Sequence, residues 1–86
     1  MSSDTEGSAL AEGDRALLAF EDEWPGHSWA KERAMRELLR MSPMSYYQRL
    51  RLIVADPAAV AAFPVACSRY QAAVAAQRAR RASRAF

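Results

Sequence analysis

The stretch AKERAMRELLRMSPMSYYQRLRLI, residues 30–53, decides the fold that the sequence predicts. Its apolar residues recur at helical spacing on both sides of a short break at residues 40–42. We therefore expect two amphipathic helices joined by a tight turn. Such a pair is a helix-turn-helix-like unit, in which the first helix packs across a second helix that is free to enter the major groove of DNA.

Both helices of this unit have recognisable starts. Ser28 can cap a first helix that ends near Leu39, because a serine oxygen accepts a hydrogen bond from a free first-turn amide. Ser42 and Pro43 begin a second helix over about residues 43–54, because the fixed φ of proline suits the first helical position. The sequence thus predicts where each helix begins.

Apolar spacing divides each helix into a buried side and an exposed side. The buried side of the first helix is formed by Ala34, Met35, Leu38 and Leu39, with Lys31 at its edge. The buried stripe of the second helix is formed by Tyr46, Tyr47, Leu50, Ile53 and Val54. Successive helical residues point about 100° apart, so both tyrosines cannot occupy the centre of one stripe. We expect Tyr46 to be the more buried and Tyr47 to reach the surface.

The segment before this unit also has helical spacing. A helix from Asp14 to Trp24 is expected, because a proline and a glycine then end it. Its acidic run at residues 21–23 is interpreted as a solvated face. The helix dipole disfavours negative charge near a C-terminus, which suggests basic neighbours such as Arg33 or Arg36.

Two further helix starts follow the central unit. Asp56 and Pro57 begin a short helix, and Phe63 with Pro64 begins the last helix. The face by which this last helix is expected to dock consists of Ala66, Cys67, Tyr70, Ala73 and Val74. Apolar spacing fades beyond Gln77, where we expect a fraying basic extension.

The predicted organisation has three parts. Residues 1–13 form a disordered acidic leader, residues 14–76 form the helical helix-turn-helix-like domain, and residues 77–86 form a basic C-terminal tail. The predicted fold class is all-α, a small orthogonal helical domain of four to five helices with no sheet. The β-prone run at residues 52–54 lies inside a helical period.

Charge is distributed unevenly along the 86 residues. Residues 1–27 hold seven acids and one base, a formal charge of −6, whereas residues 28–86 hold three acids and eleven bases, a formal charge of +8. Such asymmetry favours a basic face for a polyanion, with an acidic segment that solvates or masks it. The alternative is that both segments are simply solvated surfaces.

The sequence lacks the residues that several classes of function require. His27 is the single histidine and Cys67 the single cysteine, so neither has a like partner for zinc binding, and no disulfide can form within the chain. The sequence has no glycine-rich phosphate loop, and all three glycines lie before residue 27. We expect no enzyme activity, no cofactor and no metal.

The first residues do not resemble a signal peptide, and no apolar run approaches the roughly 20 residues of a membrane span, so we expect a cytoplasmic protein without membrane contact.

The chain resembles a family of small actinobacterial proteins of unknown function. The stretches that carry the resemblance are RALLAFEDEW at 15–24, AKERAMREL at 30–38, MSPMSYYQRL at 41–50, and the proline-marked helix starts at 56–57 and 63–64. This family implies no activity. The middle stretch is also similar to a general helix-turn-helix unit. That likeness implies that Met41, Tyr46 and Leu50 are buried.

One residue departs from that helix-turn-helix pattern in a way that bears on the backbone. Arg40 stands in the turn where such units usually have glycine. A non-glycine residue there must adopt a strained conformation or a different turn.

The leading hypothesis is a DNA-binding or transcription-associated protein, with the helix at about 43–54 as its recognition helix. Short side chains near the start of this helix suit base contacts, and arginines further along suit phosphate contacts. The expected DNA-contacting residues are Ser42, Pro43, Met44, Tyr47, Gln48, Arg49, Arg51, Arg78, Arg80, Arg81 and Arg84. The alternative for the C-terminal arginines is a tail that keeps the chain soluble, and the alternative for both tyrosines is a place in the core.

The alternative hypothesis is a module for protein interaction or dimerisation that does not bind nucleic acid. In that case the alanine-rich last helix, together with Leu52 and Met44, docks a partner helix or a second copy. The expected partners are therefore double-stranded DNA in the first hypothesis, and another protein or a homodimer in the second.

Overall fold

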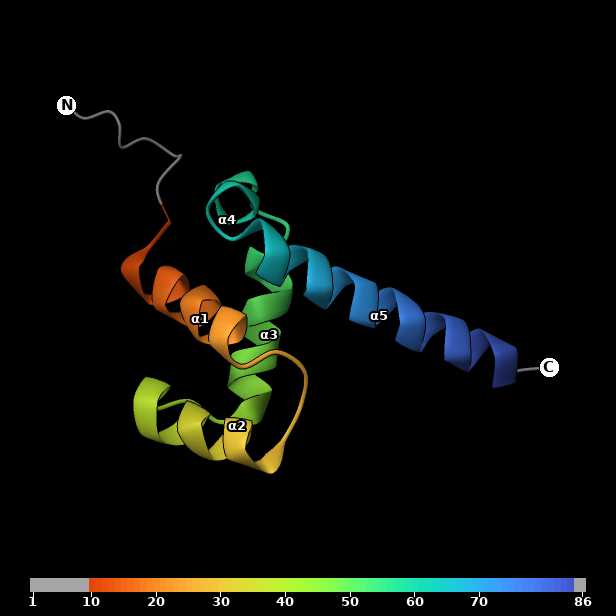
Figure 1. Ribbon diagram of the computed structural model, residues 1–86, viewed down its shortest axis with the longest axis horizontal. Helices are drawn as coiled ribbons and strands as arrows, with labels where there is room; N and C mark the ends of the chain where they lie inside the picture. The colour runs from red at the N-terminus through yellow and green to blue at the C-terminus, as the bar shows by residue number, and fades with distance from the viewer. Residues whose placement is uncertain (1–9, 85–86) are drawn as a thin grey trace.

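The computed structural model describes residues 10–84, and every regular element in this part of the chain is helical (Figure 1). In chain order the elements are α1 (Glu12–Glu23), α2 (Trp29–Ala34), the π-helical turn η1 (Met35–Leu39), α3 (Pro43–Ile53), α4 (Pro57–Ala62) and α5 (Pro64–Arg84). No strand occurs between residues 10 and 84. The predicted all-α fold class is confirmed.

Side-chain caps fix three of the helix starts. The Ser28 Oγ accepts from the Lys31 amide at 3.0 Å, and the Ser42 Oγ accepts from the Ser45 amide at 3.2 Å. Asp56 accepts from the Ala58 amide at 2.9 Å at the start of α4. These bonds satisfy amides that have no partner within the helix. The predicted starts at Ser28, Ser42 and Asp56 are confirmed.

Helix α1 begins earlier than the sequence predicted. Its first residue is Glu12, and Ala11 occupies the cap position without a side-chain hydrogen bond. Asp14 lies inside the first turn, where a negative charge is favourable to the helix dipole. Asp14 is therefore available to another element, and it binds Arg49 on α3.

The core lies where α1, η1 and α3 meet. Its fully buried side chains include Leu18 of α1, Met35 of η1, and Tyr46 with Leu50 of α3. In Figure 1, α1 crosses in front of α3, and α2 lies at the lower end of both. The burial of Tyr46 and Leu50 is as expected from the apolar stripe. Val54 is also buried and extends this core toward α4.

The π-helical turn overturns one core prediction. Leu38 was expected on the buried side with Met35, but it is 68% exposed while Met35 is fully buried. A π-helix bonds residue i to i+5, so each residue lies less far around the axis than in an α-helix. This change rotates Leu38 out of the core.

The turn between η1 and α3 has the strain expected at Arg40. This residue adopts φ 57° and ψ 37°, the left-handed region that non-glycine residues rarely occupy. It ends η1 and redirects the chain toward Ser42.

Helix α5 docks by its first turns and then leaves the globule. Ala66 and Cys67 are buried, Tyr70 and Val74 are half-buried, and Ala73, which was expected on the docking face, is exposed. Instead of fraying beyond Gln77, the helix continues to Arg84. Figure 1 shows it projecting away from α1–α4, and this projection gives the molecule its 55 Å long axis. Between residues 10 and 84, no helix is long and apolar enough to cross a membrane.

Candidate nucleic-acid interface

The exposed side of α3 brings together several residues that the sequence singled out. Met44 is 72% exposed, and Ser42, Gln48 and Arg51 are also exposed. A shallow groove of about 560 Å³ runs along this side. The residues that line it are His27, Glu32, Pro43, Met44, Tyr47, Gln48, Arg51 and Tyr70. Five predicted DNA-contacting residues therefore share one groove: Pro43, Met44, Tyr47, Gln48 and Arg51.

Tyr47 stands at the edge of this groove. Its side chain is half-buried, and its hydroxyl donates to the Gly26 carbonyl at 3.4 Å. The His27 ring lies 5.0 Å from the Tyr47 ring, centroid to centroid. Burial, followed by the negative charges of Glu21 and Glu32, raises the pKa of Tyr47 to about 12. The hydroxyl is therefore protonated and can donate a hydrogen bond at neutral pH. Tyr46 is fully buried and Tyr47 is half-buried, so the expected difference in burial between them is confirmed.

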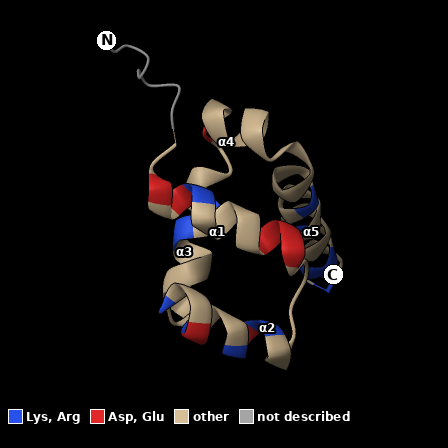
Figure 2. Cartoon of the chain, turned by 60° about the vertical axis from the view of Figure 1, so that its left-hand side comes forward, with Lys and Arg blue, Asp and Glu red and all other residues tan. Residues whose placement is uncertain are grey.

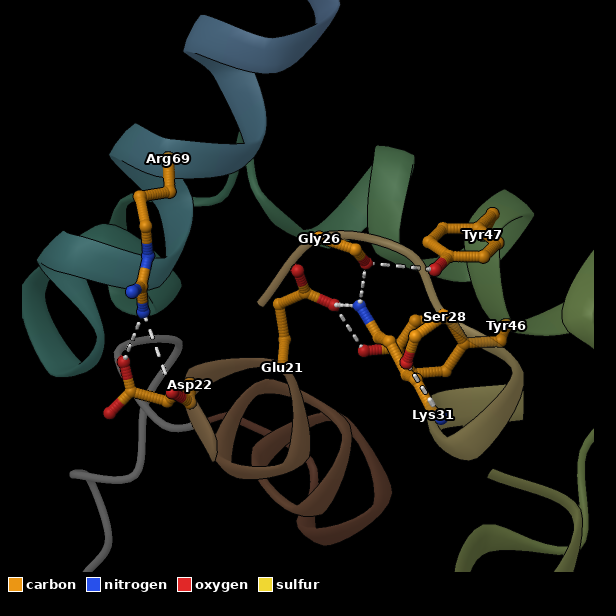
Figure 3. A network of polar contacts seen from close by, with 8 residues as sticks. All are labelled: Glu21, Asp22, Gly26, Ser28, Lys31, Tyr46, Tyr47 and Arg69. Carbon is orange, nitrogen blue, oxygen red and sulfur yellow. Dashed lines mark hydrogen bonds and ion pairs between the residues drawn. The ribbon is translucent and has the colours of Figure 1, made fainter. Parts of the chain in front are cut away.

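A buried polar network that sequence reasoning missed lies next to Tyr47 and shares the Gly26 carbonyl with it (Figure 3). The Lys31 ammonium lies 2.7 Å from Glu21 Oε1 and donates to the Gly26 carbonyl, also at 2.7 Å. The Tyr46 hydroxyl donates to the same Glu21 oxygen at 2.5 Å. Lys31 is 1% exposed and Glu21 is 6% exposed. Thus Glu21 is not part of a solvated face, and Lys31 is not at the edge of the buried side.

This network positions the groove. Glu21 belongs to α1, Lys31 to α2 and Tyr46 to α3, so one carboxylate oxygen ties three helices together. Burial and the hydrogen bond to Glu21 both raise the pKa of Tyr46, which keeps its hydroxyl protonated as a donor. The bond from Lys31 to Gly26 fixes the loop that carries His27 beside Tyr47. One feature of the sequence indicated that Lys31 is buried: it lies four residues before the buried Met35.

Two arginines contact the acidic residues of α1. Arg49 binds Asp14 through two hydrogen bonds of 2.8 Å each, and this contact raises the pKa of Arg49. Arg69 on α5 lies 3.2 Å from Asp22. The basic neighbours of the acidic run are therefore Lys31 and Arg69, and the prediction of Arg33 or Arg36 was wrong. Arg49 was predicted to contact a phosphate, but in the structure its guanidinium binds the Asp14 carboxylate.

A second groove, of about 420 Å³, lies between the 25–27 loop and α5. Its lining residues on α5 are Arg69, Tyr70, Ala73, Val74 and Gln77. Residues three, four and seven positions apart share a helix face, so this face continues into Arg80, Arg81 and Arg84. Figure 2 shows basic residues along α5 toward the C-terminus and acidic residues at the end of α1 next to it. Tyr47 and Tyr70 line both grooves and join them.

Metal ligands and a reactive thiol are not part of this surface. Among residues 10–84, no three His, Cys, Asp or Glu side chains are arranged to hold a metal ion. Cys67 is buried, and burial raises the pKa of its thiol.

A family model described as "Protein of unknown function (DUF3263)" matches residues 9–84. The chain therefore belongs to this family, as the resemblance to a family of unknown function implied. No curated protein and no solved structure matches the chain.

Proposed function

We propose that this member of the DUF3263 family binds double-stranded DNA, with α3 as the recognition helix and α5 as an arm along the phosphate backbone. The observation that carries the proposal is the joined surface of the two helices. The groove on the exposed side of α3 meets the groove along α5 at Tyr47 and Tyr70. The second groove leads toward the arginines at the end of α5.

The first part of α3 has the side chains for base contacts. Ser42, Met44 and Gln48 are exposed and lie within two helical turns. An amide such as that of Gln48 can bond to an adenine edge in the major groove, and the methionine can contact a thymine methyl group. Pro43 and Tyr47 form the wall of the same groove, where contacts with sugar and phosphate are expected.

The basic residues are placed for phosphates. Arg51 lines the α3 groove, and the arm contributes Arg78, Arg80, Arg81 and Arg84, all of them exposed. From Tyr70 to Arg84 the arm extends about 21 Å at the rise of an α-helix, enough to follow the backbone for several phosphates. Arg49 is engaged by Asp14, so about five arginines remain for phosphate contacts.

The test is amide chemical-shift mapping of the full chain with random-sequence duplex DNA at low salt. The proposal expects shifts along residues 42–51 and 78–84. Shifts that are absent, or that are confined to other helices, would contradict it. Self-association through α5 without any response to DNA would favour a protein-interaction module.

A pair of charge variants sharpens this test. The change Arg81→Gln with Arg84→Gln removes two proposed phosphate contacts. The slope of log K against log salt concentration should therefore become shallower by the contribution of about two phosphates. The matched control, Arg15→Gln with Arg36→Gln, removes the same charge from residues that line neither groove. The control should leave the salt dependence unchanged. Equal effects from both pairs would mean that only net charge matters, contrary to the proposal.

A further inference from the structure

His27 lies where the two grooves of the proposed DNA-binding surface meet. It lines both the groove of about 560 Å³ beside α3 and the groove of about 420 Å³ along α5. Its side chain is exposed, and it belongs to the loop between α1 and α2 rather than to either helix of the proposed interface. His27 was not among the predicted DNA-contacting residues. The fold thus adds a third segment, this loop, to a surface formed by α3 and α5.

Contacts with two helices hold this loop in place. Gly26 adopts φ 80°, which favours glycine, and its carbonyl accepts from the Lys31 ammonium at 2.7 Å (Figure 3). The Tyr47 hydroxyl donates to the same carbonyl at 3.4 Å. The His27 ring packs against the Tyr47 ring, with the centroids 5.0 Å apart and the ring planes at 56°. The imidazole is therefore held beside α3.

The other charges of the α3 groove cancel. Arg51 and Glu32 are the remaining charged residues among those that line it, one of each sign. Glu32 acts on this part of the surface, because its negative charge helps to raise the pKa of Tyr47. A phosphate that approaches Arg51 here therefore also meets a carboxylate. A proton on His27 changes the formal charge of the lining residues from zero to +1.

The charged residues of the α5 groove already have partners. Glu21 is bonded to Lys31 at 2.7 Å, and Arg69 lies 3.2 Å from Asp22. Of the described residues that line this groove, His27 is the one further group that can carry a full charge near neutral pH. A proton on this ring therefore makes the junction of the two grooves more positive on both sides.

We infer that His27 binds a phosphate of the DNA backbone, donating a hydrogen bond from its protonated imidazole to a phosphate oxygen. In the protonated ring both nitrogens are donors, and the bond is strengthened because donor and acceptor carry opposite charges. A backbone that passes from Arg51 in the α3 groove to the arm of α5 crosses the junction where His27 lies. The inference rests on the proposed DNA binding, because it names a further contact with the same ligand.

A phosphate contact at His27 makes DNA affinity depend on pH. The duplex prefers the protonated ring, so the affinity should rise as the pH falls through the range in which histidines gain their charge. The ionisable groups around the imidazole are Glu21 of α1, Glu32 of α2, Tyr47 of α3 and Tyr70 of α5, with the cations Lys31, Arg51 and Arg69. Carboxylates ordinarily titrate near pH 4, and tyrosines, lysines and arginines at about pH 10 or above. Measurements between about pH 5.5 and about pH 7.5 therefore isolate the histidine.

Fluorescence anisotropy of a labelled random-sequence duplex, titrated with the full chain at one salt concentration, tests this dependence. Wild-type affinity should be up to about tenfold higher at about pH 5.5 than at about pH 7.5, which is the change in the charged fraction of an ordinary histidine. His27→Gln should bind equally at both pH values, with the low affinity of the wild-type chain at the higher pH. His27→Arg stays positive and should bind tightly at both. Circular dichroism would verify that the variants are folded.

A matched control moves the histidine out of the grooves. His27→Gln with Leu38→His places it at a position that is 68% exposed and lines neither groove. This double variant should bind DNA as His27→Gln does.

The outcomes separate this inference from the proposed function. DNA binding by the wild-type chain that is equal at both pH values would overturn the role of His27 and leave the proposed function standing. The same holds for a pH dependence that persists in His27→Gln or that the moved histidine restores. Equal losses of affinity in His27→Gln and His27→Arg would likewise overturn it, because they would make His27 only a packing partner of Tyr47. No DNA binding by the wild-type chain at either pH would overturn both.

Discussion

Lys31 Nζ and Glu21 Oε1 lie 2.7 Å apart, with both side chains almost completely removed from solvent. The Tyr46 hydroxyl donates to the same carboxylate oxygen, and the Gly26 carbonyl accepts a second bond from the lysine. This buried ion pair joins α1 to α2 and fixes the loop beside the α3 groove (Figure 3). Burying two charges is costly, so the pair serves to specify one arrangement of these helices as much as to stabilise them.

Removing one member of this pair should be strongly destabilising. Lys31→Met leaves the Glu21 carboxylate buried without its counter-charge, at a cost of about 3–5 kcal/mol in the free energy of unfolding. The double change Glu21→Leu with Lys31→Met removes both charges and should cost less than Lys31→Met alone. Urea unfolding measures the double variant and the two single variants, Lys31→Met and Glu21→Leu. A double variant that loses the sum of the two single losses would show that the residues act independently.

Stability should decline at alkaline pH because of two tyrosines. Burial raises the pKa of Tyr46, and it raises the pKa of Tyr47 to about 12. The folded chain therefore holds both phenolic protons more tightly than the unfolded chain, whose tyrosines titrate near pH 10. Below that pH these groups leave stability unchanged, and above it the free energy of unfolding falls as pH rises.

Urea unfolding at about pH 9 and about pH 11 measures this decline. Tyr46→Phe removes one of the titrating groups, so the variant should lose less stability between the two pH values than the wild-type chain. An equal decline in both proteins would assign the alkaline sensitivity to other residues.

Arg40 is the position where a glycine should be favourable. Its φ of 57° costs an L-residue about 1–2 kcal/mol, whereas glycine adopts this conformation readily. We expect Arg40→Gly to raise the free energy of unfolding by up to about 1 kcal/mol and Arg40→Val to lower it. Thermal and urea unfolding would measure both. Destabilisation by glycine would mean that the arginine side chain makes a compensating contribution.

Local chemistry explains what the sequence predicted well. Serine or aspartate followed by a proline, or by the first residues of a helix, satisfies free amides within four residues of the chain. The starts at Ser28, Ser42 and Asp56 were therefore predictable. Tyr46 was also predictable, because apolar spacing on α3 places it at the centre of the stripe.

What the sequence could not predict depends on partners distant along the chain. Lys31 is buried because Glu21 and Tyr46 reach it from two other helices, and its own charge gave no sign of this. Leu38 is exposed because η1 is wound as a π-helix, which apolar spacing at the α-helical period does not detect. The pairing of Arg49 with Asp14 spans 35 positions and was likewise beyond local patterns.

The contact between Asp14 and Arg49 leads to a prediction for DNA binding. Asp14→Ala frees the Arg49 guanidinium on the proposed recognition helix and removes a negative charge beside it. DNA affinity should increase, and the slope of log K against log salt concentration should steepen by the contribution of about one phosphate. The Arg49 side chain is 49% exposed, so the ion pair is partly screened by solvent, and its loss should lower folding stability only slightly. A folded variant whose DNA affinity and salt dependence are unchanged would place Arg49 outside the interface.

The most direct test of the central claim is the affinity of the wild-type chain for duplex DNA across a salt series. Neutralising about five phosphates predicts that log K falls against log salt concentration with a slope of about −4 to −5. The Arg81→Gln, Arg84→Gln variant should give a slope closer to about −3 under the same conditions. Affinity that does not depend on salt, or no binding below about 100 µM protein at low salt, would contradict the proposed DNA-binding function.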